Sequence, residues 1–191
     1  MLPSRLAQLE KIEARAPVVS EKIIAMARAA ANEAEFRRPF ANLIEDIGRE
    51  FDIPILLREE YTVASGRIDA AYNRLIIEYK DPGILRGSLS HKATKGAVDQ
   101  LTDYMVDVAR EERQQLSRLA GVATDGHYFI FIRHVDEDWL KEQPVPVNRH
   151  TTARFLKLLF SLVSGKALIP KNLIDDFGSQ NQITPQRITR A

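Results

Sequence analysis

The sequence predicts a mixed α/β domain in which helices flank a central sheet. Three observations support this fold class. Apolar residues recur at helical spacing up to residue 51, whereas after Pro54 they follow the shorter period of strands. A long helical segment then separates three strand-like segments from two more, and a final helix follows. This order of helices and strands is typical of a layered α/β domain.

Composition limits the possible classes of function. A chain of 191 residues is long enough for one domain with a substantial core. Lysine and arginine (27) almost balance aspartate and glutamate (26), for a net charge of +1. Any nucleic-acid partner therefore requires basic groups gathered in one place. The absence of cysteine excludes disulfides, thiol nucleophiles and cysteine–zinc sites.

Targeting signals are missing from the sequence. The N-terminus, Met-Leu-Pro-Ser-Arg, lacks the apolar stretch of a signal peptide. No apolar run approaches the roughly 18 residues that a membrane span needs. We therefore expect a soluble, cytoplasmic protein without a membrane partner.

The N-terminal region is predicted to be helical. Pro17 interrupts the pattern, so one helix should end near Arg15 and another should begin near Ser20, a favourable N-cap. From Asn32 to Phe51 the apolar residues again recur at helical spacing. Pro39 lies within this stretch, where it either kinks the helix or begins a new one as its first residue.

The middle of the chain is predicted to form the sheet. Strand-like segments lie at 55–57 with 61–63, at 67–72 and at 75–80, then a helix at about 97–118 and strands at 119–124 and 128–132. Asp81-Pro82-Gly83 ends the third segment, and a polar loop is expected from Ile84 to Lys95. Asp125-Gly126 is a strong hairpin signal between the last two strands.

The C-terminal region suggests where the domain ends. Pro144-Val145-Pro146 is expected to act as a linker, and a helix should run from about Thr151 to Val163, stopping at Ser164-Gly165. Thr184-Pro185 has the features of a helix start shortly before Ala191, so a further folded domain is expected to follow. The predicted parts are an N-terminal helical extension (1–31), a core (32–143), and a C-terminal helix with the start of a linker (144–191).

One hairpin carries the candidate chemistry. If Asn73-Arg74 is a two-residue turn, Tyr72 pairs with Leu75, and Asp69 lies opposite Glu78. Strand alternation then places Glu78 and Lys80 on one face. The other face carries the apolar residues Leu75, Ile77 and Tyr79.

Two carboxylates on one face of a hairpin repel each other, so this arrangement needs a compensating cation. A hard divalent ion bound through one or two carboxylates is a suitable candidate. Lys80 can neutralise negative charge that develops nearby. The alternative is a solvated hairpin face with ordinary surface charges.

Asp69 followed by Glu78-Tyr79-Lys80 resembles the motif of the PD-(D/E)XK nuclease superfamily. Ile68 stands where the family usually has proline. The family's order of a helix, a three-stranded meander, a helix and a further strand is similar to that of residues 32–133. The resemblance therefore implies a restriction-endonuclease-like core with extra N- and C-terminal helices.

A glutamate before the meander resembles the family's first motif. In Asn32-Glu33-Ala34-Glu35-Phe36-Arg37 we assign Glu33 to this role, with Glu35 and Glu45 as rivals. The alternative is a solvated first-turn acid that favours the helix dipole.

Gln100 and Tyr104 resemble the Gln-X-X-X-Tyr motif of several branches of the superfamily, which lies near the active site and helps hold nucleic acid. Residues four apart share a helix face. The alternative is a half-buried tyrosine beside a polar neighbour. The basic residues of the preceding loop either contact phosphates or are simply solvated. These residues are Arg86, His91, Lys92 and Lys95.

The resemblance implies a Mg²⁺-dependent endonuclease that hydrolyses double-stranded DNA. Asp69, Glu78 and the backbone carbonyl of Tyr79 would hold one or two Mg²⁺ ions, for which Mn²⁺ can substitute. Glu33 would complete the site directly or through water. Lys80 would orient the attacking water or stabilise charge on the phosphate.

The chain is most similar to the N-terminal nuclease domains of single-chain restriction–modification enzymes. Covalently joined methyltransferase or specificity domains are therefore expected in the full-length protein, and residues 173–178 suit such a join. Two alternatives stay open. One is a repair or junction-resolving nuclease, and the other is a non-catalytic nuclease-like module that binds nucleic acid.

Overall fold

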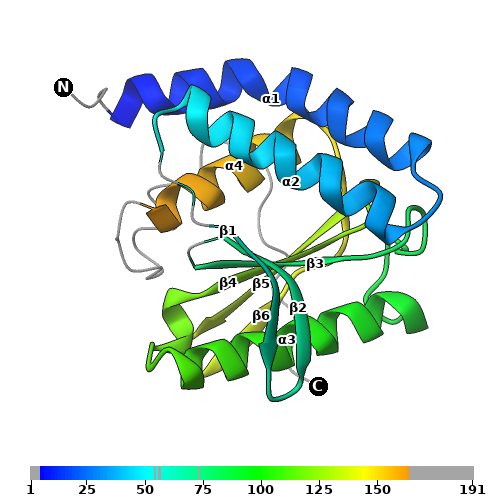
Figure 1. Ribbon diagram of the computed structural model, residues 1–191, viewed down its shortest axis with the longest axis vertical. Helices are drawn as coiled ribbons and strands as arrows, with labels where there is room; N and C mark the ends of the chain where they lie inside the picture. The colour runs from blue at the N-terminus through cyan, green and yellow to red at the C-terminus, as the bar shows by residue number, and fades with distance from the viewer. Residues whose placement is uncertain (1–4, 54, 56, 73, 164–191) are drawn as a thin grey trace.

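The computed structural model describes residues 5–53, 55, 57–72 and 74–163 (Figure 1). Its helices are α1 (Arg5–Ala29), α2 (Glu33–Glu50), α3 (Lys92–Glu111) and α4 (Arg149–Val163), with a 3₁₀ turn η1 (Leu116–Arg118). Its strands are β1 (Leu57–Val63), β2 (Gly66–Tyr72), β3 (Leu75–Tyr79), β4 (Ala120–Thr124), β5 (Tyr128–Val135), β6 (Asp138–Lys141) and β7 (Val145–Pro146). The prediction of a mixed α/β fold with a central sheet flanked by helices is confirmed.

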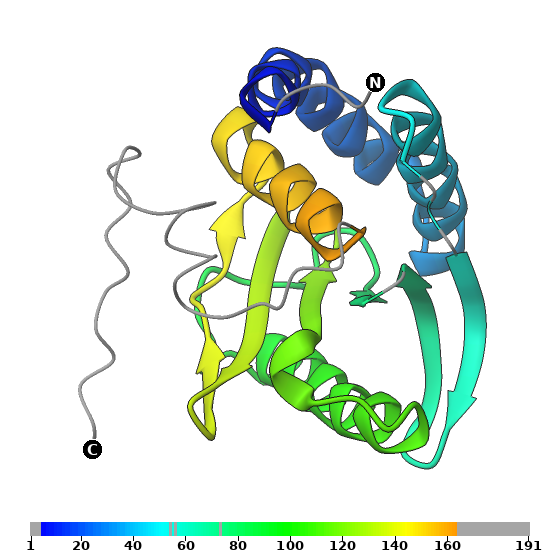
Figure 2. The same ribbon diagram turned by 90° about the vertical axis from the view of Figure 1, so that its left-hand side faces the viewer.

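The strands form one sheet in the order β1-β2-β3-β4-β5-β6, and β7 also pairs with β5. Strands β3 and β4 are parallel, and the other pairs among the described strands are antiparallel. Helix α3 connects the two parallel strands, as parallel pairing requires. It covers one face of the sheet, while α1, α2 and α4 cover the other (Figures 1 and 2).

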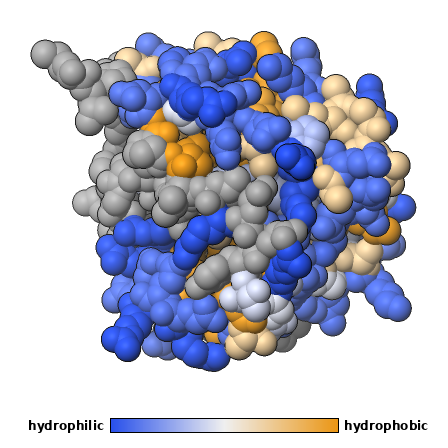
Figure 3. All heavy atoms as spheres, in the orientation of Figure 1, coloured by the Kyte–Doolittle hydropathy of each residue, from blue (hydrophilic) through white to orange (hydrophobic). Residues whose placement is uncertain are grey.

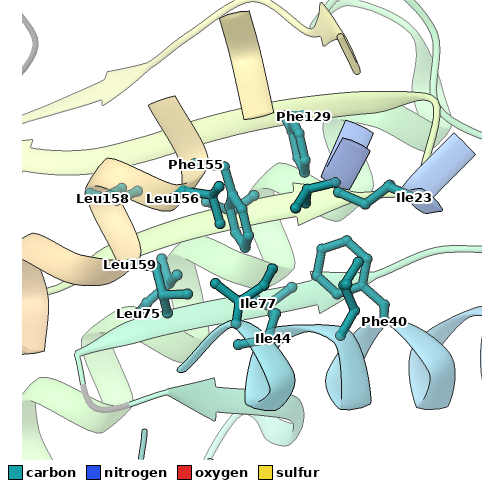
Figure 4. Packing of buried hydrophobic residues seen from close by; sticks show 14 of the residues in the cluster. Ile23, Phe40, Ile44, Leu75, Ile77, Phe129, Phe155, Leu156, Leu158 and Leu159 are labelled. Atoms are coloured by element: carbon teal, nitrogen blue, oxygen red, sulfur yellow. The ribbon is translucent and has the colours of Figure 1, made fainter. Parts of the chain in front are cut away.

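Two hydrophobic cores fill the space between these layers. The larger lies between the sheet and the three helices α1, α2 and α4, and includes Phe40, Ile77 and Phe155 (Figure 4). The smaller lies under α3 and includes Ile76 and Leu101. Ile76 and Ile77 are neighbours on β3 that face different cores, so the alternation expected for this strand is present. The outer surface seen in Figure 3 is mainly hydrophilic, with small separate apolar patches.

Helix α1 corrects the prediction of a break at Pro17. The helix is continuous from Arg5 to Ala29, with Pro17 inside it. Proline removes one backbone hydrogen bond, which destabilises a helix interior. The cost is offset because α1 buries an apolar stripe, packed mainly against α4. The stripe consists of Ile12, Ala16, Val19, Ile23 and Ala27, each at most 2% exposed.

Helix α2 has the extent that its apolar spacing predicts. Asn32 is the N-cap and its side chain accepts a hydrogen bond from the backbone N–H of Glu35, and Phe51 is the C-cap. Pro39 lies within the helix and does not begin a new one. The buried residues of α2 include Phe36, so the predicted core face is confirmed.

Several other boundaries differ from the expectation. Helix α3 begins at Lys92 and ends at Glu111, earlier at both ends than the predicted 97–118. Its first turn forms because Thr94 is buried and its hydroxyl accepts the backbone N–H of Arg86 at 3.0 Å. Strand β6 was not predicted, because its turn uses Asp136 and Glu137, both with positive φ, instead of glycine.

The segment Pro144-Val145-Pro146 is part of the sheet, and the prediction of a linker was wrong. Val145 pairs with Phe129, and the backbone N–H of Val147 donates to His127 O at 2.8 Å. Proline is tolerated here because β7 is a short strand at the edge of the sheet, where a missing donor costs little.

Hydrophobic packing crosses both boundaries suggested by the sequence. Residues of α1 before position 31 and of α4 after position 144 belong to the same core as α2 and the sheet. The predicted features at 164–165, 173–178 and 184–185 lie outside the described residues. No helix of the described part has the length and apolar character needed to cross a membrane.

Candidate active site

The predicted register of the β2–β3 hairpin is confirmed. Tyr72 pairs with Leu75, and the described pairs continue to Ala70 opposite Ile77. Beyond this point Asp69 reaches across with its side chain, since its Oδ2 accepts the backbone N–H of Tyr79 at 2.9 Å. The candidate carboxylate therefore replaces a ladder bond at the place where the two strands begin to separate.

The side chains of β2 on either side of Asp69 pack into different hydrophobic cores. Ala70 and Tyr72 belong to the larger core, whereas Ile68 belongs to the smaller core under α3. Strict alternation would put all three side chains on one side of the sheet. Strand β2 thus bends at Asp69, and the end of the β1–β2 hairpin lies towards α3 (Figure 2).

Glu78 is buried, so the alternative of a solvated hairpin face is wrong. Its side chain is 2% exposed, because β3 lies between β2 and β4 and is covered by a helix layer on each face. Oε1 accepts a hydrogen bond from the Lys80 ammonium, and Oε2 has no hydrogen-bond partner among the described residues. Buried polar atoms without partners are uncommon, and each calls for an explanation such as a bound water, a bound ion or a catalytic role.

The charges around Glu78 shift its ionisation. The pKa of Glu78 is raised to about 7, mainly by burial and further by the charge of Asp69, although Lys80 opposes the shift. Burial by itself would lower the pKa of Lys80, but attraction and hydrogen bonding to Glu78 outweigh burial and raise it. At neutral pH the site therefore holds a charged lysine beside a carboxyl group that is only partly ionised.

The stability of the metal-free protein should reflect this raised pKa. The folded state holds the Glu78 proton more tightly than the unfolded state does. The protonated carboxyl group therefore stabilises the fold fully below pH 4.5, and this stabilisation is lost as the pH rises through about 7. The loss is at most roughly 3 to 4 kcal/mol, since the pKa rises from 4.5 to about 7 and one pKa unit is worth about 1.4 kcal/mol. Glu78→Gln should remove this part of the pH dependence in urea unfolding with EDTA. Parallel pH profiles for the two proteins would contradict the raised pKa.

Glu33 lies near the site, on the first turn of α2. Burial raises the pKa of Glu33, and the charge of Asp69 adds to the shift, while Lys80 and Arg37 oppose it. The three carboxylates Glu33, Asp69 and Glu78 thus form one cluster, in which the negative charge of one raises the pKa of another.

The two rivals of Glu33 have other positions. Glu35 closes a capping box at the start of α2, where its Oε2 accepts the backbone N–H of Ala31 at 2.9 Å. Glu45 is twelve positions beyond Glu33, which corresponds to roughly 18 Å along the helix. Of these three glutamates, Glu33 is the one whose ionisation is affected by Asp69 and Lys80.

Glu33→Gln should weaken Mg²⁺ binding by about tenfold or more, because it removes a negative charge from the cluster. Glu35→Gln is the matched control, since it makes the same chemical change two residues away, in the capping box. Titration calorimetry measures both affinities. A greater loss in Glu35→Gln would show that the first motif is misassigned.

Gln100 and Tyr104 connect α3 to the end of β3. The Lys80 ammonium donates to Gln100 Oε1 at 3.1 Å, and Gln100 Nε2 donates to the Tyr104 hydroxyl at 2.6 Å. Tyr104 is 4% exposed, so its contact with the site runs through Gln100. The pair therefore holds Lys80 in place from the third and fourth turns of α3.

The basic residues predicted to contact nucleic acid are exposed but differ in setting. The Arg86 guanidinium folds back onto the carbonyls of Gly83 and Leu85. Lys92 and Lys95 lie on the first turns of α3 and not in a loop as predicted. Their side chains are exposed.

Arg37 and Asp81 belong to the site although the sequence did not single them out for it. Arg37 Nη1 lies 3.3 Å from Asp69 Oδ1, and Asp81 Oδ1 accepts the backbone N–H of Glu33 at 2.7 Å. Arg37 follows Glu33 by four positions, so helical spacing places both on one face of α2. That spacing was a usable signal for Arg37, whereas Asp81 had none.

The donor set fits a hard divalent cation, although it is not assembled for one. Within the described part of the chain, no group of three or more His, Asp or Glu side chains is arranged to hold a metal ion. The chain's own cations pair with the acids instead, Lys80 with Glu78 and Arg37 with Asp69. The unpartnered Oε2 of buried Glu78, close to Asp69, provides the oxygen chemistry that Mg²⁺ prefers.

Two shallow hollows lie elsewhere, between α1 and α2. Met26, Pro39 and Asn42 line both of them. Neither is lined by Asp69, Glu78 or Lys80.

Comparison of the chain with models of known families, with curated proteins and with solved structures finds no match.

Proposed function

We propose that this chain carries a Mg²⁺-dependent endonuclease site that hydrolyses DNA phosphodiester bonds. The observation that carries the proposal is the environment of Glu78. This carboxylate is buried, has one oxygen without a partner, and lies beside Asp69 and Lys80. A buried acid with a raised pKa next to a second acid and a lysine is typical of a catalytic site.

The fold order supports the same proposal. Helix α2, the β1–β2–β3 meander, helix α3 and strand β4 follow one another as in the restriction-endonuclease-like core, and β3 and β4 are parallel. The candidate acids and the lysine lie at the end of β3 and on the strand beside it. We assign the chain to this fold, and to the cleavage module of a restriction–modification enzyme, as part of the proposal.

Each residue would have a defined task. Asp69 and Glu78 would hold the metal ion, with the Tyr79 carbonyl, and Glu33 would complete the site. A bound Mg²⁺ lowers the pKa of a bound water and stabilises charge on phosphate. Lys80, held by Gln100, would be directed at the phosphate and stabilise the negative charge that grows there during hydrolysis.

A non-catalytic nucleic-acid-binding module is the second candidate. It is favoured by the two ion pairs of Lys80 with Glu78 and Arg37 with Asp69, which neutralise the acids without a metal. The retention of all three motif residues favours the nuclease.

The test is incubation of supercoiled plasmid with the purified protein in Mg²⁺, in Ca²⁺ and in EDTA. We expect nicked or linear DNA with Mg²⁺ only, and no cleavage by Glu78→Gln prepared in parallel. DNA that is bound but stays intact in Mg²⁺ and Mn²⁺ would favour the binding module.

A further inference from the structure

We infer that Asp81 is a positioning residue that holds Glu33 at the metal site through the backbone of α2. The inference rests on the proposed function and adds to it a residue outside the motifs. Its basis is the 2.7 Å hydrogen bond from the Glu33 backbone N–H to Asp81 Oδ1, which joins positions 48 residues apart.

Asp81 begins a rigid turn immediately after Lys80. The backbone N–H of Ile84 donates to Asp81 O at 3.1 Å, which closes the turn. Pro82 occupies its second position, and Gly83, with φ of 79°, its third. This is the pattern of a type II turn, in which proline fixes one φ angle and glycine accepts the positive one.

The backbone on both sides of this turn is hydrogen-bonded to residues at the C-terminal end of β4. Before it, the backbone N–H of Lys80 donates to Thr124 O at 3.0 Å. After it, the backbone N–H of Leu85 donates to Oδ2 of the buried Asp125 at 3.0 Å. Asp81 therefore projects from a fixed part of the framework, and its carboxylate is a fixed acceptor for α2.

The contact between Asp81 and Glu33 is separate from the cap of the helix. Asn32 and Glu35 close the capping box with the N–H groups of Glu35 and Ala31, and the N–H of Glu33 goes to Asp81. One turn later, Arg37 pairs with Asp69. The first turns of α2 are thus attached to the segment that follows β3, through Asp81, and to the middle of β2, through Asp69. Glu33 lies on this attached part of the helix.

Repulsion between the two side chains opposes this contact, because Asp81 is a further acid in an acidic cluster, although the N-terminus of α2 favours a negative acceptor. Its negative charge raises the pKa of Glu33, in addition to the larger effects of burial and of Asp69. The hydrogen bond therefore acts through geometry. A neutral side chain that keeps the acceptor oxygen should do the same work.

The experiment compares three variants of the intact protein with the wild type. Asp81→Ala removes the acceptor and should weaken Mg²⁺ binding by about tenfold or more, the size typical of lost outer partners of metal ligands. Titration calorimetry measures this affinity, and the half-saturating Mg²⁺ concentration for plasmid cleavage should change by the same factor. Asp81→Asn keeps an acceptor oxygen and should stay within about threefold. Asn32→Ala is the matched control, since it weakens the start of α2 without removing the Asp81 contact, and it should also stay within about threefold.

A double-mutant cycle with Glu33→Gln shows through which residue Asp81 acts. If Asp81 acts through Glu33, then Asp81→Ala should add little to the loss in affinity caused by Glu33→Gln. Additive losses, equal losses in Asp81→Asn and Asp81→Ala, or an Asn32→Ala effect as large as that of Asp81→Ala would each overturn the inference. A wild type that neither binds Mg²⁺ in calorimetry nor cuts DNA would overturn the proposed function itself, and the inference with it.

Discussion

Replacing Glu78 with glutamine should abolish Mg²⁺-dependent cleavage and leave the metal-free protein as stable as the wild type or more stable. Glutamine keeps the shape of the side chain and the acceptor for Lys80, but it cannot supply the negative oxygen that a metal ion needs. The loss should be on the order of 10³-fold or more, because removal of one electrostatic stabiliser alone costs about 10²–10³. Stability should not fall, since glutamine avoids burying an ionised carboxylate.

Plasmid cleavage and urea unfolding in EDTA measure the two halves of this prediction. Glu35→Gln is the control, since it removes a carboxylate of the capping box and should leave cleavage nearly unchanged. A Glu78→Gln protein that melts several degrees below the wild type in EDTA would assign Glu78 a structural role instead.

Asp69 should behave differently when it is shortened to alanine. Asp69 Oδ2 accepts the backbone N–H of Tyr79, and Oδ1 pairs with Arg37. Asp69→Ala therefore removes the acceptor of the Tyr79 N–H and one ion pair of Arg37. An unsatisfied buried donor costs about 1–3 kcal/mol. Asp69→Asn, which keeps an acceptor for Tyr79, is therefore the cleaner variant for separating activity from stability.

Replacing Lys80 with alanine should reduce cleavage by a factor on the order of 10² or more, while affinity for DNA falls much less. The ammonium is held at the end of β3 by Glu78 and Gln100, close to the proposed metal ligands. A charge in this position matters most where negative charge grows in the transition state. Binding of intact DNA depends instead on many phosphate contacts, of which Lys80 supplies one.

Two assays separate cleavage of DNA from binding of DNA. Plasmid nicking at saturating Mg²⁺ measures the first, and a gel shift with Ca²⁺ in place of Mg²⁺ measures the second. Lys80→Arg should rescue cleavage poorly, because the planar guanidinium is bulkier and differently hydrated than the ammonium. Lys92→Ala is the control for a lysine on the exposed start of α3 and should change affinity more than rate. A Lys80→Ala protein that cuts at the normal rate would remove Lys80 from the mechanism.

Periodicity and turn chemistry in the sequence were enough to predict the local elements. The spacing of apolar residues predicted α2 and its core face, and the short turn before Leu75 predicted the register of the β2–β3 hairpin. Alternation along β3 placed Glu78 on the face opposite Ile77. These features are decided by residues a few positions apart, over distances at which backbone geometry alone controls which side chains are neighbours.

Only the tertiary structure decided that α1 is continuous across Pro17 and that Glu78 is buried. Helix α1 continues across Pro17 because packing on α4 offsets the lost backbone bond. Glu78 loses its access to water because β4 pairs with β3. Both effects come from segments distant in sequence, and local propensity contains no information about them.

The same distinction separates Glu33 from Glu35 and explains why Asp81 was missed. Sequence spacing allowed either glutamate in the first motif, and the fold engages Glu35 in the capping box and leaves Glu33 beside Asp69. The bond between Asp81 and Glu33 spans 48 positions. Such a contact forms only when the chain folds and closes a long loop, which costs conformational entropy. No local pattern in the sequence therefore predicts it.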